Sequence, residues 1–222
     1  MSYKALLAGL AVLCTLSARA QEDKVKHWQE MVERLATQSG LKSTYTIKIE
    51  SNAAKHYIAY ALFKIDTQGI STGTVGINSF YFAQLTADEQ EGALAHEIGH
   101  YFYKHPQKSV VALLAQWIGS CSAAGTAYGT MSTGLGGRLA AAVVVCYGLY
   151  KITDIARCYM SRNQEFQADA HAIALTGNIP ALEATLQKRR DWFESKDKQT
   201  SWLFQDHPTS EQRIAQLHTK RN

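Results

Sequence analysis

The order of apolar and polar residues along the chain predicts a helix followed by a small sheet. Apolar side chains recur at helical spacing over residues 25–35, and Gly40 closes that helix. Alternating apolar and polar residues predict a strand over residues 44–50. The apolar face of this strand carries Tyr45, Ile47 and Ile49. We expect two further strands, over residues 57–65 and 71–78.

A longer helix is predicted over residues 87–103. Thr86 stands at its N-cap and Glu89 follows three residues later, which is the pattern of a capping box. Within this span Gly92 and Gly99 weaken the helix, each by up to ~1 kcal/mol relative to alanine. A glycine retained at that cost indicates that another element packs closely against the helix at Gly99.

The middle of the chain predicts an apolar helical hairpin over residues 108–152. Residues 109–137 contain no charged side chain, and residues 139–150 are apolar again after Arg138. Polar residues such as Gln116 weaken the first run as a membrane span, and Arg138 cuts the second run below the ~20 residues that cross a bilayer. A membrane-associated or self-associating hairpin is therefore favoured over a true double span.

Residues 180–222 are predicted to be helical and basic, with Pro180 at a first helical position. The side chains expected to face the core are Leu182, Leu186 and Trp192. Residues 194–205 are expected to form a loop. The segment from His207 to Ser210 then leads into a final helix that carries Arg213.

The candidate chemistry begins with His96-Glu97-Ile98-Gly99-His100, inside the helix predicted over residues 87–103. Two histidines four residues apart lie on one helix face, so both imidazoles can reach a single metal ion. Glu97 projects beside that metal, where it can take a proton from water. This is the minimal constellation for metal-assisted hydrolysis.

A second helix offers the remaining ligand. A catalytic zinc takes three protein ligands and keeps a fourth position open, and Glu165 is the candidate for the third. Asp169 lies four residues later on the same face, where it can accept a hydrogen bond from the outer ring nitrogen of a ligating histidine, with His96 as the expected donor. Without the first motif, both carboxylates would be interpreted as part of a solvated helix face.

Four groups of residues together resemble one family. They are Leu85 to Glu89, Ala95 to His100, Ser161-Arg162 with Glu165 and Ala168-Asp169, and His207 to Thr209 with Arg213-Ile214. The family is that of the zinc metalloendopeptidases that includes the HtpX-type membrane proteases, the CAAX prenyl proteases and their soluble periplasmic relatives. The resemblance covers about residues 44–217. It departs from the family at Ala170-His171-Ala172, where an Arg or small residue and a Gly often stand.

The resemblance implies an α+β, mainly α fold. It implies a zincin-like, gluzincin-type catalytic domain with a small β-sheet beside the metal-binding helix and an apolar helical hairpin as an insertion. In zincins an edge strand near the metal holds an extended substrate by main-chain hydrogen bonds. By its position the strand over residues 71–78 is the candidate, and a purely structural edge strand is the alternative.

The resemblance also implies one Zn²⁺ per chain on His96, His100 and Glu165, with Glu97 as the general base. It brings the turn at His207 toward the zinc, where His207 could stabilise the oxyanion or cap the open metal position. Arg213 could then form an ion pair with an acidic residue of the site. The alternative is that His207 and Arg213 merely anchor the terminal helix.

The predicted function is zinc-dependent endopeptidase activity on exported or envelope proteins, with polypeptides as the substrate. One alternative is a catalytically silent metal-binding or chaperone-like module, and the presence of Glu97 argues against it because a ligand-only site needs no base. A membrane-embedded processing protease is the other alternative, and it requires that the hairpin inserts.

The N-terminus has the plan of a signal peptide over residues 1–20, with a short positive start, an apolar run and Ala18-Arg19-Ala20 as the cleavage site. Residues 21–222 remain for one zinc metallopeptidase domain. We expect an exported protein of the periplasm or cell envelope, with membrane association or self-association through Ser109–Tyr150.

The net charge and the remaining cysteines and histidines add little to the functional prediction. Removing Lys4 and Arg19 lowers the formal net charge from +4 to +2, which is too small to indicate a nucleic-acid partner. After the leader three cysteines remain, an odd number whose pairing cannot be deduced from sequence. They are Cys121, Cys146 and Cys158. Five histidines receive no chemical role, namely His27, His56, His105, His171 and His218.

Overall fold

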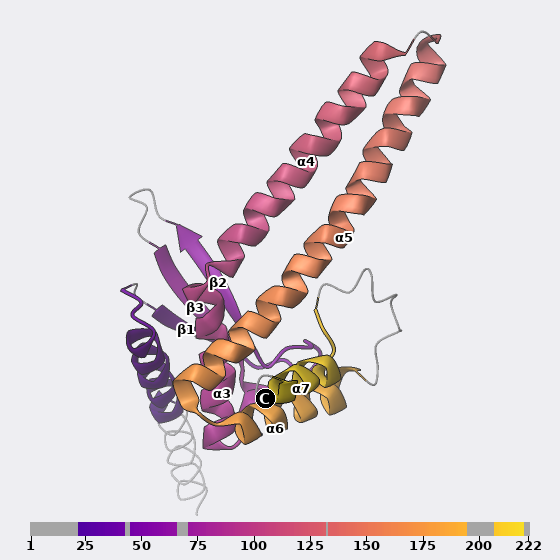
Figure 1. Cartoon of the computed structure of the whole chain (residues 1–222). Coiled ribbons are helices and arrows are strands. Elements are labelled where there is room, and N and C mark those ends of the chain that lie inside the picture. Colours follow the sequence, from indigo (N-terminus) through magenta and orange to yellow (C-terminus); the bar gives the residue numbers. More distant parts are fainter. Residues whose placement is uncertain (1–21, 43–44, 66–70, 132, 195–206, 220–222) are drawn as a thin grey trace, which may run out of the picture.

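The computed structural model describes residues 22–42, 45–65, 71–131, 133–194 and 207–219. The signal peptide expected over residues 1–20 lies outside these ranges, as does nearly all of the loop expected over residues 194–205. Within them the chain is mainly helical, with one small sheet (Figure 1). This confirms the predicted α+β, mainly α fold.

The described helices and strands follow the predicted order. The strands are β1 (Tyr45–Glu50), β2 (Ala59–Ile65) and β3 (Ser71–Asn78). The helices are α2 (Ser79–Phe82), α3 (Ala87–Phe102), α4 (His105–Thr130), α5 (Leu135–Thr176), α6 (Ile179–Arg189) with a π-helical extension η1 (Arg190–Glu194), and α7 (Ser210–Thr219). Residues 22–38 are also helical, and Gly40 ends that helix with a positive φ of 71°.

The sheet has the order β1-β3-β2, with β1 parallel and β2 antiparallel to β3. The expectation that residues 71–78 form an edge strand is therefore wrong, because β3 is paired on both sides. The reason lies in its two glycines. The Tyr45 ring of β1 fills the space beside Gly73, and the Tyr60 ring of β2 fills the space beside Gly76. Only a central strand can accept one ring from each neighbour, so β1 and β2 form the two edges of the sheet.

The core lies between the N-terminal helix, the sheet and α3. The N-terminal helix buries its predicted apolar face, and Trp28 meets Phe82 edge to face with ring centroids 5.1 Å apart. Val75 and Ile77 of β3 and Leu94 and Ile98 of α3 are fully buried in the same cluster. This core fixes α3 against the sheet.

Helix α3 begins and packs as its sequence predicts. The Thr86 backbone N–H donates to Glu89 Oε2 at 2.7 Å, and the Glu89 N–H donates to Thr86 Oγ1 at 3.3 Å, which completes the capping box. A Cβ on Gly99 would lie only 3.0 Å from the Cα of Ala168 on α5. The close neighbour predicted at Gly99 is therefore α5, and the glycine lets the two backbones approach.

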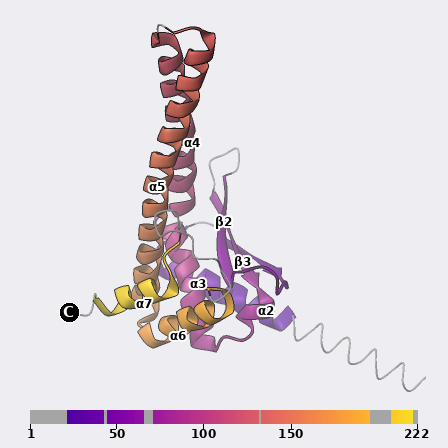
Figure 2. The same cartoon turned by 90° about the vertical axis from the view of Figure 1, so that its right-hand side faces the viewer.

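Helices α4 and α5 form a hairpin that extends away from the rest of the molecule (Figures 1 and 2). Helix α5 has 42 residues and is therefore roughly 60 Å long. Its outer part pairs with α4, and its inner part crosses α3 and carries Glu165. Both helices are long and apolar enough to cross a membrane. The three described cysteines are free thiols.

Candidate metal centre

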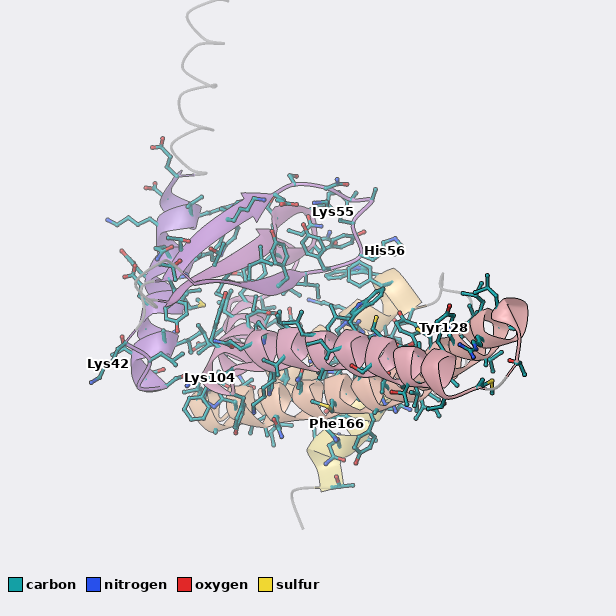
Figure 3. The ribbon with its side chains drawn as sticks, turned by 90° about the horizontal axis from the view of Figure 1, so that it is seen from above. Lys42, Lys55, His56, Lys104, Tyr128 and Phe166 are labelled. Atoms are coloured by element: carbon teal, nitrogen blue, oxygen red, sulfur yellow. The ribbon has the colours of Figure 1, made fainter. Side chains whose placement is uncertain are left out.

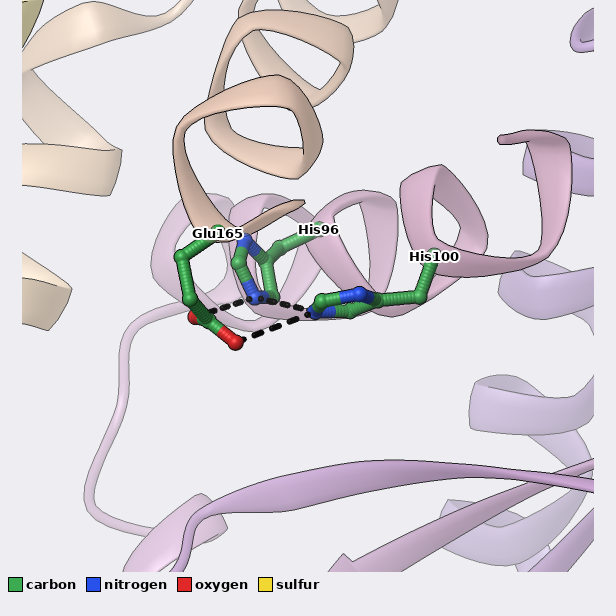
Figure 4. Close-up of side chains that lie close together, drawn as sticks. All are labelled: His96, His100 and Glu165. Atoms are coloured by element: carbon green, nitrogen blue, oxygen red, sulfur yellow. Dashed lines mark hydrogen bonds and ion pairs between the residues drawn. The ribbon is translucent and has the colours of Figure 1, made fainter. Parts of the chain in front are cut away.

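Three side chains from two helices converge on one point. His96 and His100 lie one turn apart on α3, and Glu165 projects toward them from α5 (Figure 4). The two Nε2 atoms are 3.1 Å apart. Carboxylate oxygens of Glu165 lie 3.4 Å from His96 Nε2 and 3.5 Å from His100 Nε2. The capping box and Gly99 position this site, because they fix where α3 starts and how closely α5 approaches it.

These separations fit a tetrahedral zinc ion. Zinc–ligand bonds of about 2.0–2.1 Å in tetrahedral geometry place any two ligands about 3.3 Å apart. The three observed separations, 3.1, 3.4 and 3.5 Å, bracket that value. The buried carboxylates Glu97, Glu165 and Asp169 outnumber the one buried guanidinium, Arg213, so a divalent cation would offset the excess negative charge.

Asp169 and Arg213 contact two of the three candidate ligands, His96 and Glu165. Asp169 Oδ1 lies 2.8 Å from His96 Nδ1, the ring nitrogen that faces away from Glu165. The Arg213 Nε donates to Asp169 Oδ2 at 2.8 Å, and Arg213 Nη1 lies 3.1 Å from Glu165 Oε2. Arg213 thus connects α7 to both carboxylates of α5, and all three side chains are buried.

The charges of the site follow from this arrangement. Burial opposes ionisation of both carboxylates, but Arg213 holds the pKa of Glu165 well below its ordinary range, and Arg213 with His96 lowers the pKa of Asp169 to about 2. Burial and Arg213 oppose protonation of His96, yet hydrogen bonds to Asp169 and Glu165 raise its pKa to about 9. Burial lowers the pKa of His100 to about 3. The raised pKa of His96 thus reflects the negative charge that Asp169 and Glu165 bring to this site.

Glu97 lies beside the three donor atoms but forms no hydrogen bond or ion pair with them. Its side chain is buried and lines the cleft in front of the centre. Burial raises the pKa of Glu97 to about 7. Among the described residues its carboxylate makes no hydrogen bond or ion pair. It is therefore available to exchange a proton near neutral pH.

His207 lies at the rim of the cleft, before the start of α7. Its Nδ1 is 3.1 Å from Glu165 Oε1, and its side chain is 54% exposed. The contact with Glu165 thus places His207 at the candidate metal centre.

The cleft has a volume of about 470 Å³ and combines the site with the edge of the sheet. Residues 57–61, which include the start of the edge strand β2, line it on one side. The metal-centre residues, the first turn of α4 and part of α6 line the remainder. The strand nearest the site is therefore β2, in place of the expected β3.

Two residues at the centre were given no role by the sequence. His105, the first residue of α4, places its Nδ1 2.9 Å from His100 Nδ1. Its Nε2 lies 3.0 Å from Oε1 of Gln167 on α5. The only signal in the sequence was the position of His105, five residues after His100 and directly before Pro106.

Comparison with known proteins identifies the family. The sequence matches the family described as Peptidase family M48 over residues 22–221. The chain belongs to peptidase family M48. This confirms the resemblance found from the motifs, and the M48 chain is a metallopeptidase that acts on polypeptides.

Two relatives illustrate how far the likeness extends. This M48 chain is 26% identical over 212 residues to a protein named "Protease HtpX homolog" from Campylobacter curvus (strain 525.92), a match that covers 84% of the chain and 72% of that protein. Its fold is similar to the crystal structure of S. mikatae Ste24p, with a TM-score of 0.64 and 18% identity, over 86% of this chain and 49% of that one. The M48 chain spans about half the length of Ste24p, and that likeness concerns the fold alone.

Proposed function

We propose that this M48 peptidase is a zinc-dependent endopeptidase that holds one Zn²⁺ on His96, His100 and Glu165. The observation that carries the proposal is the set of separations among the three donor atoms, which match a tetrahedral zinc site within a buried, negatively charged pocket. When bound, zinc lowers the pKa of water and polarises the carbonyl of the scissile bond.

Glu97 is proposed as the general base. It lines the cleft beside the donor atoms, and its raised pKa of about 7 suits proton exchange near neutral pH. Glu97 accepts a proton from the attacking water and returns it to the leaving amine. A catalytically silent metal-binding module, the main alternative, would have no use for this buried carboxyl.

Asp169 and Arg213 are proposed to orient the ligands. Asp169 accepts the Nδ1–H of His96, which leaves the Nε2 lone pair for the metal and makes the ring a better donor. Arg213 holds Asp169 and Glu165 in place through three contacts to α5. Loss of either residue would disturb the centre without removing a ligand.

His207 is proposed to assist the reacting carbonyl. It lines the cleft, remains half exposed, and is tethered to Glu165 at 3.1 Å. From this position it can donate a hydrogen bond to the oxygen that gains negative charge during hydrolysis.

The edge strand β2 is proposed to bind the substrate. Residues 57–61 line the cleft, and the outer edge of β2 has no strand partner among the described residues. An extended peptide can add to such an edge through main-chain hydrogen bonds. We propose exported or envelope proteins as the substrates.

The hairpin is proposed to associate with a membrane. Gln116, which weakened the first run as a span, is buried against α5, where its amide donates to the Tyr150 carbonyl. Arg138 lies at the tip, where its guanidinium donates to the Thr133 carbonyl. The outward surface is apolar, with exposed side chains that include Val111, Trp117, Ile118, Val143 and Val144. A bilayer interior matches this surface, and self-association is the alternative.

The zinc content of Glu165→Ala tests the proposal. Removing one of three ligands should lower zinc well below one ion per chain, as measured by elemental analysis. Glu211→Ala is the control, because Glu211 lies on the exposed surface of α7 and should leave the zinc content unchanged. Full occupancy in Glu165→Ala would mean that the third ligand lies elsewhere.

A further inference from the structure

A second series of hydrogen-bonded side chains reaches the metal centre from the root of the hairpin. His105 is only 2% exposed and lies between His100 and Gln167. Its Nδ1 is 2.9 Å from His100 Nδ1, and its Nε2 is 3.0 Å from Gln167 Oε1. The three side chains therefore connect α3, α4 and α5 in one continuous path.

The backbone between α3 and α4 places the His105 ring. Lys104 has a φ of 57° and is the only described residue other than glycine with a positive φ. Pro106 then occupies the first turn of α4. Figure 3 places Lys104 at the root of the hairpin, and Tyr128 lies toward its tip. The left-handed turn lets His105 return toward His100, and the ring stacks on Tyr103 with centroids 5.5 Å apart.

The position of the hydrogen on the His100 ring determines which atoms donate and which accept along this path. A neutral imidazole carries one N–H, so only its other nitrogen can bind a metal. His100 turns Nε2 toward His96 and Glu165, so a metal there requires the hydrogen on Nδ1. That N–H donates to His105 Nδ1, which leaves the hydrogen of His105 on Nε2. The Nε2–H then donates to the carbonyl oxygen of Gln167.

We propose that His105 and Gln167 are positioning residues that hold His100 with its hydrogen on Nδ1 and its Nε2 toward zinc. The inference rests on the proposed role of His100 as a ligand. The two ligands of α3 are thus oriented by different partners. His96 donates to the carboxylate of Asp169, whereas His100 donates to a neutral imidazole that α4 supplies. The apolar hairpin therefore contributes its first residue directly to the metal centre.

Zinc affinity of the full chain, measured by competition with a chromogenic chelator, tests the inference. Partners that orient a metal ligand typically account for 10–100-fold in metal affinity, so His105→Phe should bind zinc at least ~10-fold more weakly. His171→Phe is the matched control. His171 is also a buried histidine, stacked on Phe102, but it contacts no proposed ligand, so its variant should keep wild-type affinity.

A second pair of variants separates positioning from packing. Gln167 is exposed, so Gln167→Leu should fold normally and yet lower zinc affinity by ~10-fold, at the small end of that range. Gln167→Glu retains an acceptor oxygen and should restore the affinity. Nitrogen NMR of the histidine rings in chelator-treated protein should show neutral His100 with its hydrogen on Nδ1 in the wild type. In Gln167→Leu it should show a mixture of the two neutral tautomers, with the hydrogen on Nδ1 in some molecules and on Nε2 in others.

The outcomes distinguish this inference from the proposed function. Wild-type affinity in both His105→Phe and Gln167→Leu, together with loss of zinc in His100→Ala, would overturn the positioning role alone. Wild-type affinity in His100→Ala would overturn the proposed metal site itself.

Discussion

Asp169 joins a proposed zinc ligand to the C-terminal helix of the protein. It lies between His96 and Arg213, and each of these contacts is 2.8 Å or shorter. Its buried negative charge thus faces a positive charge on one side and an N–H donor on the other, which explains why its pKa falls to about 2.

Asp169→Asn is expected to weaken zinc binding by ~10–100-fold while leaving all three proposed ligands in place. The amide lacks the charge that strengthens the bond from His96, and it leaves Arg213 buried with one fewer anionic partner. Competitive zinc titration against the wild type measures the effect. Equal affinities would show that Asp169 does not act through His96.

Chelator-treated protein is expected to lose stability as the pH rises, because of Glu97. Its pKa is about 7 in the folded protein and near 4.5 when unfolded. Because the folded state holds this proton more tightly, the stabilisation is full below about pH 4.5 and is lost as the pH rises through 7. That difference in pKa corresponds to on the order of 3 kcal/mol. Urea unfolding at pH 5 and pH 8 should show this loss in the wild type and its absence in Glu97→Gln. Equal losses in both proteins would contradict the assignment.

The sequence could predict part of the centre at this scale. Helical spacing alone places His96 and His100 on one face. The third ligand that a catalytic zinc requires made Glu165 the candidate, and the family resemblance implies the same residue. His105 was missed because its approach depends on the left-handed turn at Lys104, which leaves no periodic signal in the sequence.

Among the elements, the contact between α3 and α5 governs the geometry of the centre. His96 and His100 lie on one helix and Glu165 on the other, so the distance between the two backbones sets the space for a metal. Gly99 lies where the two helices pack closely, opposite Ala168.

Gly99→Ala is expected to destabilise the protein and lower its zinc affinity. The added methyl would lie 3.0 Å from the Cα and 3.1 Å from the carbonyl oxygen of Ala168, so α5 would have to move outward. Gly92→Ala on the same helix is the control. Its methyl meets its nearest neighbour at 3.8 Å, so the higher helix propensity of alanine should raise stability by up to ~1 kcal/mol. Thermal unfolding and zinc titration of both variants measure these effects. A Gly99→Ala protein as stable as Gly92→Ala would contradict the account.

Local patterns predicted the elements better than their arrangement. The capping box and the strand alternation depend on residues close in sequence, and the structure confirms them. The order of the strands depends on which rings cover Gly73 and Gly76, a long-range contact that alternation does not encode. The edge strand beside the site was therefore expected at β3, whereas β2 occupies that position.

For the whole molecule, the hairpin and the metal centre are parts of one unit. Helix α5 runs without a break from the apolar arm to Glu165 and Asp169, and α4 begins at His105. The sequence predicted the hairpin from its lack of charge. It could not reveal that Gln116 faces the partner helix, since that depends on how the two arms pack.

Ile118→Glu combined with Val144→Glu is expected to release the protein from membranes. Both residues are at least 66% exposed on the apolar surface of the hairpin, and each charge in the hydrocarbon core costs about 2.5 kcal/mol or more. The matched control adds two glutamates to α7, as Gln212→Glu with Ala215→Glu. Flotation with phospholipid vesicles and zinc content are measured together. Unchanged flotation would contradict membrane association, and a dissociated oligomer in place of lost flotation would favour self-association.

The most direct test of the proposed function is peptide hydrolysis by zinc-loaded Glu97→Gln. Glutamine keeps the size of the side chain but cannot accept a proton from water. Hydrolysis should therefore fall ~100-fold or more while the zinc content stays at the wild-type value. Glu91→Gln, a nearby glutamate on α3 that pairs with Arg34 outside the cleft, should retain full activity. Wild-type turnover by pure, zinc-loaded Glu97→Gln would contradict the account.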